Sequence, residues 1–267
     1  MRQPACAVAM LFAAASLLGA CHRAVQHIPD AVADAALGRP ALPALRYARA
    51  TRDAVVGLTL PRAVEAYPEL QAKLYDDGQR ELDEFVAQAA EDRRHFRSKG
   101  VAQPKPYERR IVWAITAVAP HLISLRQAWS GYTGDVHPAH GSDVLLWDRV
   151  RNEIVLPSQL FRPDADAARL DALLCQAVRR AIAAHPRPDN LLPSHCPAWA
   201  DSRAVLAPSA QAYRIGGLMF LFDPSVIGAY AQGDYQVLIP QTAFRDALAP
   251  GWAVDFAGDP AQARAGS

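Results

Sequence analysis

Two long stretches of the chain repeat their apolar residues every three or four positions, which is the spacing of one face of an α-helix. The first runs over 70–99 and is followed by Gly100, and the second runs over 164–185 and is followed by Pro186. Charged residues fill the remaining positions of both stretches. Each pattern therefore predicts an amphipathic helix with one buried face, which ends at a residue that stops helices.

Several shorter stretches are apolar throughout or alternate between apolar and polar residues, as strands do. They are Val55–Leu60, Arg109–Ala119, His121–Tyr132, Val144–Trp147, Glu153–Leu156, Ala204–Leu206, Leu218–Phe222 and Gln236–Ile239. A short helix is expected over 241–248. Because the strands and helices are grouped rather than strictly alternating, the sequence predicts an α+β fold in which mainly antiparallel sheets pack with two long helices.

The pattern also divides the chain into segments. We expect a signal peptide over 1–20, a flexible tether over 21–51, an N-terminal α+β module over 52–162, a C-terminal α+β module over 163–250 and a flexible tail over 251–267. The tether is proposed because prolines and alanines occur there without sustained periodicity. The two modules are expected to be coupled subdomains that meet near residues 160–165.

The first twenty residues have the design of an export signal. A basic residue, Arg2, precedes an apolar run that extends from Ala5 to Ala20, and this is too short for a membrane span of about 20 apolar residues. The run closes with Leu18–Cys21, which resembles the lipobox of bacterial lipoproteins. Lipidation of Cys21 would place the protein in the cell envelope, lipid-anchored and facing the periplasm. His22 favours the outer membrane, and an ordinary secretory signal is the alternative.

Composition narrows the class of partner. Lys+Arg 28 against Asp+Glu 27 gives a net charge of +1, so the chain lacks the basic excess of a nucleic-acid-binding protein. Hydrophobic residues make up 51% and aromatic residues 8% of the chain, which argues against wholesale disorder. The expected partners are the membrane, through the lipid anchor, and a ligand in the envelope.

Beyond the signal and the predicted lipidation site Cys21, two cysteines remain, Cys175 and Cys196. In an exported protein an even pair favours a disulfide, which would close a loop of about 20 residues and stabilise the fold by roughly 3 kcal/mol. A buried pair of free thiols and a metal site that includes His185 and His195 are the alternatives.

Several segments resemble a known family in consistent order. Gly217–Pro224, Ile227–Gly233 and Gln236–Pro240 are similar to the C-terminal signature of the RsiV-like domain of unknown function, found in bacterial envelope proteins. Tyr67–Leu70 and Tyr132–Pro138 are similar to its companion N-terminal module. Within the latter, the usual Gly-Gly-Ala-His is here the segment 134–137. Members of the family include a lysozyme-binding anti-sigma factor and a peptidoglycan deacetylase that carries the N-terminal module. The resemblance therefore implies a non-catalytic envelope binding module for a lysozyme-like protein or peptidoglycan.

Candidate chemistry is sparse. His137 and His140 form a close pair, which is either a structured loop or a metal site completed by Asp135, Asp143 or His121. The chain lacks the Gly-x-Ser-x-Gly, P-loop and His-Glu-x-x-His motifs. We therefore expect no catalytic residue, no metal and no cofactor. An envelope hydrolase or metal-dependent enzyme that uses the histidine loop is one alternative, and a structural partner of another envelope protein is another.

Aromatic residues supply the candidates for ligand binding, because Trp and Tyr suit both sugar stacking and protein interfaces. Trp113 and Trp147 occupy strand patterns and are expected in the core. Trp129, Tyr132 and Trp199 are expected nearer the surface, in or beside the sheet and its loops. The predicted ligand-binding set is Trp129, Tyr132, Asp135, His137, His140 and Trp199.

Lipidation of Cys21 is directly testable. Mass spectrometry of the protein from bacterial envelopes should find an N-terminus at Cys21 that carries fatty acyl chains, and Cys21→Ser should remove the acyl mass. An intact, unacylated start at Met1 would contradict the predicted compartment.

Overall fold

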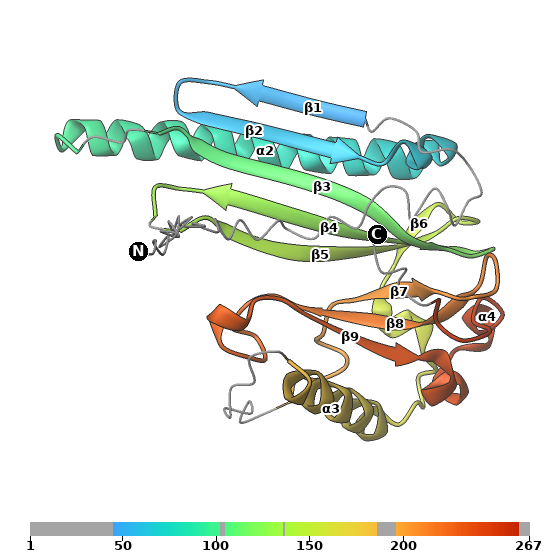
Figure 1. The fold of residues 1–267 in the computed structure, drawn as a ribbon. Coiled ribbons are helices and arrows are strands. Elements are labelled where there is room, and N and C mark those ends of the chain that lie inside the picture. Colours follow the sequence, from blue (N-terminus) through green and yellow to red (C-terminus); the bar gives the residue numbers. More distant parts are fainter. Residues whose placement is uncertain (1–44, 102–104, 136, 186–195, 262–267) are drawn as a thin grey trace, which may run out of the picture.

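The computed structural model describes residues 45–101, 105–135, 137–185 and 196–261. The predicted signal peptide and Cys21 lie outside these ranges. Two sheets and two long helices make up the described part (Figure 1), and the prediction of an α+β fold is confirmed. None of the helices in this part of the chain combines the length and the apolarity needed to cross a membrane.

The larger sheet contains six strands in sequence order. They are β1 (Leu45–Ala50), β2 (Ala54–Leu60), β3 (Tyr107–Val118), β4 (Leu122–Tyr132), β5 (Ala139–Asp148) and β6 (Glu153–Val155). All neighbours are antiparallel except β2 and β3, which are parallel. The short helix η1 (Arg62–Ala66) and the long helix α2 (Pro68–Ser98) make the crossover that a parallel pair requires.

Helix α2 covers one face of this sheet. Its buried residues Leu70, Leu74, Leu82, Val86 and Ala89 join a core cluster with the alternate residues of β2 and β3. At Gly78 the helix comes so close to the sheet that an added Cβ would lie 2.9 Å from a methyl carbon of Leu58. The predicted helix is therefore present, and a glycine within it permits the closest approach.

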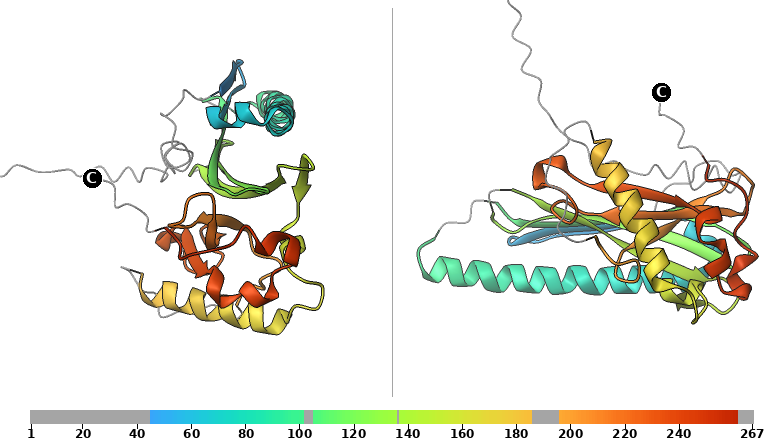
Figure 2. Two further views of the ribbon diagram at one scale, coloured as in Figure 1. Left: turned by 90° about the vertical axis from the view of Figure 1, so that its right-hand side faces the viewer. Right: turned by 90° about the horizontal axis from the view of Figure 1, so that it is seen from below.

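The smaller sheet is antiparallel and contains β7 (Ala204–Pro208), β8 (Ile215–Phe222) and β9 (Tyr235–Pro240). Helix α3 (Ala167–Ala183) packs on it through Leu170, Leu174, Val178 and Ile182. Short helical turns complete the module, namely η2 (Pro157–Leu160), η3 (Tyr230–Gln232), η4 (Gln241–Ala243), η5 (Arg245–Ala247) and α4 (Pro250–Ala253). Seen end-on in Figure 2, the layers run from α2 through the two sheets to α3.

The two sheets share buried contacts. Leu122 and Leu146 of the larger sheet belong to the core cluster of the smaller one. The fully buried Ser124 hydroxyl accepts hydrogen bonds from the Thr116 hydroxyl and from the backbone N–H of Leu206, each 2.9 Å long. This hydrogen bond from β7 of the smaller sheet to Ser124 of the larger sheet fixes the relative position of the two sheets. If the sheets shifted, the buried N–H of Leu206 would lose its acceptor, which costs free energy.

Three expectations about local structure need correction. Residues 45–50 were expected in the tether, but they form strand β1, which pairs antiparallel with β2 along its whole length, and the Tyr47 and Arg49 side chains also reach Asp83 on α2. Residues 251–261 were expected in the flexible tail, but bridges join Phe256 to Ile215 and Pro260 to Ser209. The helix expected over 241–248 is two separate turns, η4 and η5.

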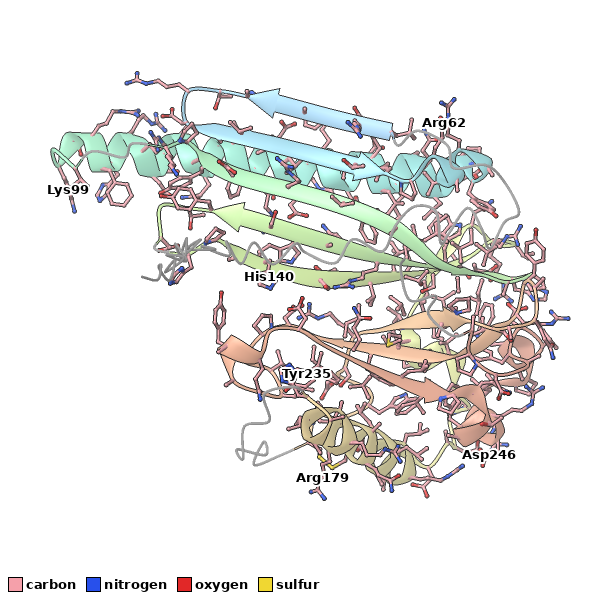
Figure 3. The ribbon with its side chains drawn as sticks, viewed as in Figure 1. Arg62, Lys99, His140, Arg179, Tyr235 and Asp246 are labelled. Carbon is pink, nitrogen blue, oxygen red and sulfur yellow. A yellow bond between two sulfur atoms is a disulfide. The ribbon has the colours of Figure 1, made fainter. Side chains whose placement is uncertain are left out.

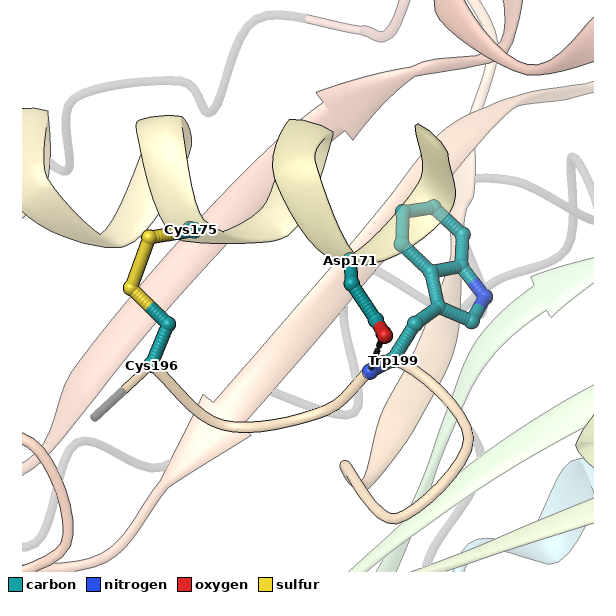
Figure 4. The surroundings of a disulfide bond; sticks show 4 residues. All are labelled: Asp171, Cys175, Cys196 and Trp199. Carbon is teal, nitrogen blue, oxygen red and sulfur yellow. Dashed lines mark hydrogen bonds between the residues drawn. A yellow bond between two sulfur atoms is a disulfide. The ribbon is translucent and has the colours of Figure 1, made fainter. Parts of the chain in front are cut away.

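The structure joins Cys175 of α3 to Cys196 in a disulfide, as predicted. Three residues after Cys196, the backbone N–H of Trp199 donates a 2.7 Å hydrogen bond to the carboxylate of Asp171. Figure 4 shows both contacts side by side on α3. The disulfide and this hydrogen bond together fasten the segment before β7 to the helix.

Asp53 gives the fold a pH dependence. Its Oδ1 accepts hydrogen bonds from Arg93 Nε at 3.2 Å and Arg97 Nη1 at 3.0 Å, which join the β1–β2 turn to α2. Burial works to raise the pKa of Asp53, but the hydrogen bonds from Arg97 and Arg93 outweigh it and lower the pKa below its ordinary value. The carboxylate therefore stabilises the native state above its unfolded pKa, and this contribution is lost as the pH falls through the folded pKa.

Asp53→Asn should lower the free energy of unfolding by about 1–2 kcal/mol at pH 7. The difference from the unmodified protein should disappear in strongly acidic buffer, where Asp53 is protonated. Urea unfolding at several pH values measures it, and a difference that stays constant across this range would contradict the assignment.

Candidate functional site

Most of the predicted ligand-binding residues gather where β4 ends and β5 begins. Trp129 and Tyr132 lie at the end of β4, and His140 is the second residue of β5. Asp135 and His137 are exposed in the connection between the strands, where the Thr133 hydroxyl donates a 2.8 Å hydrogen bond to the Asp135 carboxylate. The β4–β5 register pairs Ser130 with His140, so residues from both strands share one end of the hairpin.

Alternation along the strands separates Trp129 from His140. The Arg109 guanidinium lies 4.2 Å from the centre of the Trp129 ring, and it also forms a 2.6 Å ion pair with Glu81 of α2. His140 Nε2 instead lies 3.3 Å from Asp234 Oδ1, just before β9 (Figure 3). The side chains of Trp129 and His140 therefore lie on opposite faces of the sheet.

The Trp129 ring is held tightly in place. It packs against the core beneath α2, and Gly141, its partner in the β4–β5 register, lies so close that an added Cβ would be 2.7 Å from a ring carbon. With Arg109 over the ring as well, Trp129 is half-buried and largely covered. It supports the hairpin more than it offers a free aromatic face.

Trp199 lies elsewhere, and its prediction as a surface ligand-binding residue is wrong. It is 7% exposed and packs edge-to-face with Phe161, Phe220 and Phe244, with ring centres 4.7–5.7 Å apart. The contacts to α3 through Asp171 and the disulfide draw its loop onto the smaller sheet. A proline-rich loop gives no periodicity that could have indicated this burial.

The structure adds Arg203, which sequence reasoning missed. Strand β6 pairs only with Leu146–Asp148, so the preceding part of β5 is an edge. Arg203 Nη1 reaches this edge, donates to the carbonyl oxygen of Ser142 and forms a 2.9 Å ion pair with Asp223. Asp143 lies 3.8 Å from the same nitrogen. Arg203 thus joins the β5 edge to the end of β8.

Arg126 is the second residue that was missed. It is 7% exposed, and its Nε and Nη2 donate to the Ser142 hydroxyl at 3.2 and 2.8 Å. Burial lowers its pKa, while the more distant Asp234 and Asp223 act in the opposite direction. The Ser142 hydroxyl therefore accepts the hydrogen bonds of the buried Arg126 guanidinium, and the negative charges of Asp234 and Asp223 stabilise its charged form from a greater distance.

The exposed part of the hairpin end is acidic. Asp135 is exposed, and the side chains of Asp143 and Asp234 are 60% and 37% exposed. Partial burial and the neighbouring Asp223 and Glu81 raise the pKa of Asp143, and Arg203 and Arg109 oppose this rise. We define the hairpin surface as Tyr132, Asp135, His137, His140, Asp143 and Asp234, which contains three aspartates. Two arginines lie beside it: Arg203 is 3.8 Å from Asp143, and the register places the exposed Arg110 in line with Ser130 and His140.

The residues considered for a metal site do not converge. His121 lies at the start of β4, at the far end of the sheet from His137 and His140, and it binds Asp255. Within the ranges that the structure describes, no three histidine, cysteine, aspartate or glutamate residues are grouped so that they could hold a metal ion.

Comparison with known proteins places the fold. The chain is similar to a DUF3298 family protein from Pseudomonas aeruginosa PAO1, with a TM-score of 0.53 and 14% sequence identity over 82% of this chain and 95% of that one. A member of the same family from Bacteroides fragilis NCTC 9343 has a TM-score of 0.52 and 13% identity, over 79% and 95%. No family model and no curated protein matches the sequence. At this identity the likeness establishes a shared fold.

The link between Arg126 and Ser142 is testable by a double-mutant cycle. Ser142→Ala should lower the free energy of unfolding by roughly 1–3 kcal/mol, because the buried guanidinium loses its acceptor. In an Arg126→Met background, which has no buried charge to satisfy, the same substitution should cost close to nothing. Urea unfolding of the four proteins gives the coupling, and an equal cost in both backgrounds would exclude it.

Proposed function

We propose that the mature protein is a lipoprotein of the cell envelope, anchored through Cys21, and that its hairpin surface binds a basic, lysozyme-like protein without catalysing a reaction. The single observation that carries the proposal is the set of three exposed or half-exposed aspartates at the hairpin end. A negative patch favours a positive partner through long-range attraction, which acts mainly on the association rate.

The hairpin surface is also held in shape before a partner arrives. The Thr133 hydroxyl positions Asp135, and Asp234 positions His140. Beneath them, Arg203 fastens the β5 edge to Asp223 of the C-terminal module. Such contacts reduce the ordering cost of association, which otherwise offsets much of the energy gained in an interface.

Peptidoglycan is less favoured at this surface. Binding of a glycan strand usually uses the open face of an aromatic ring. The Trp129 ring is instead covered by Arg109 and packed against Gly141. Tyr132 is the remaining half-exposed aromatic residue of the predicted set. The surface therefore suits a protein better than a sugar polymer.

Binding assays with a basic c-type lysozyme test the proposal. The protein, immobilised on a sensor surface, should bind lysozyme with an association rate that falls steeply as salt is added. Asp135→Lys together with Asp143→Lys should slow association by about tenfold, because two attractive charges become repulsive.

Glu69→Lys together with Asp76→Lys provides the control matched in charge, because both are exposed acidic residues on α2, away from the hairpin. This variant should bind as the unmodified protein does. Absence of lysozyme binding, or an equal loss in the control, would overturn the proposal. Sedimentation with purified sacculi serves as the second arm, and retention by sacculi without lysozyme binding, if Asp135→Lys with Asp143→Lys abolishes it, would replace the protein partner with peptidoglycan.

A further inference from the structure

A pocket of about 270 Å³ lies at the opposite end of the larger sheet from the hairpin. The turn before β4 supplies His121, the turn after β5 supplies Asp148 and Arg151, and the α4 segment supplies Gly251 and Trp252. Both modules therefore contribute walls to it. Its volume lies just below the range of roughly 300–1,000 Å³ that is usual for small-molecule sites.

The histidine in this pocket is fixed by a buried carboxylate. His121 Nδ1 lies 2.9 Å from Asp255 Oδ1, and its backbone N–H donates a 3.1 Å hydrogen bond to Asp255 Oδ2. Asp255 is fully buried. Because a carboxylate accepts, we assign the Nδ1 proton to this bond, so that Nε2 is the ring nitrogen that can serve a ligand.

A second carboxylate is held at the pocket wall. Asp148 Oδ1 accepts hydrogen bonds from the backbone N–H groups of Val150 at 2.7 Å and Arg151 at 3.0 Å. Its Oδ2 lies 3.6 Å from Arg151 Nη1, and the Arg151 side chain is 68% exposed. The Asp148 side chain is only 4% exposed, so the turn holds a fixed and nearly buried acceptor beside an exposed donor.

Trp252 completes the wall with an aromatic surface. It follows Pro250 in α4, is partly buried and packs against the core of the C-terminal module. One rigid indole beside a carboxylate, an imidazole and a guanidinium provides an apolar face together with both hydrogen-bond acceptors and donors.

We propose that this pocket binds one sugar residue of a saccharide. A sugar ring has an apolar C–H face that suits Trp252, and hydroxyl groups that donate to Asp148 or His121 and accept from Arg151. An anion is less suited, because Asp148 and the buried Asp255 lie in or behind the wall. The proposal concerns a different end of the molecule and stands independently of lysozyme binding at the hairpin surface.

Two variants of opposite kind test the site. Trp252→Ala removes the aromatic wall. Gly251→Phe instead adds a bulky ring at a residue that lines the pocket, where a Cβ would meet no atom within 4 Å. Tyr230→Ala is the matched control, because Tyr230 is an exposed aromatic residue, 59% exposed, in η3 outside the pocket.

Calorimetry and saturation-transfer NMR with N-acetylglucosamine, chitotriose and maltotriose measure binding. At least one of these sugars should bind saturably, about tenfold more weakly to Trp252→Ala, which corresponds to about 1.4 kcal/mol, and not at all to Gly251→Phe. Tyr230→Ala and the hairpin variant with Asp135→Lys should bind it unchanged.

Absence of saturable binding of all three sugars would overturn the proposal, and so would binding that Gly251→Phe leaves intact. Thermal unfolding of each variant shows whether it is folded. Because the hairpin variant retains the pocket, a failure of lysozyme binding and a failure of saccharide binding are separate results.

Discussion

The arrangement of the molecule depends on one constraint, namely that the larger sheet must cover both of its faces. Helix α2 covers one face along the length of β2 and β3. The C-terminal module covers the other, and at the β3–β4 turn it does so with apolar contacts through Leu122 and a shared buried hydroxyl, Ser124. Burial of apolar surface at this end is the main force that couples the modules, and the buried hydroxyl sets their alignment, since a shift of the layers would leave the Leu206 N–H unpaired.

The same layers meet through polar groups at the hairpin end. There, Arg203 reaches Ser142 and Asp223, and His140 reaches Asp234. Exposed polar pairs contribute little to stability compared with apolar burial. The contacts at the hairpin end therefore contribute less to the free energy of packing between the modules than the contacts at the β3–β4 end. The polar side chains at the hairpin end stay partly exposed to solvent. Its edge strand is closed to further pairing at Ser142 because Arg203 occupies that carbonyl.

Periodicity predicted the elements that bury one face against a neighbour. The helices over 68–98 and 167–183 and the strands of both sheets apart from β1 follow from it. What it could not predict depends on contacts between distant residues. Strand β1 pairs with β2 and contacts Asp83 on α2, and the segment around Asp255 is held by the contact of its carboxylate with His121, 134 residues away. No local pattern carries such information.

The candidate site divides in the same way. The sequence located the hairpin residues because their spacing placed them beside a turn, but it could not separate Trp129 from His140 without the strand register, which puts adjacent positions on opposite faces. Arg126 and Arg203 escaped notice because each is defined by Ser142, on a neighbouring strand or in another module. Trp199 was predicted at the surface because its sequence neighbours give no sign of burial. Its loop is buried by the hydrogen bond and the disulfide that join it to α3. A side chain whose role is set by long-range partners is therefore recognised from the fold, whereas one whose role is set by its own strand or turn is recognised from the sequence.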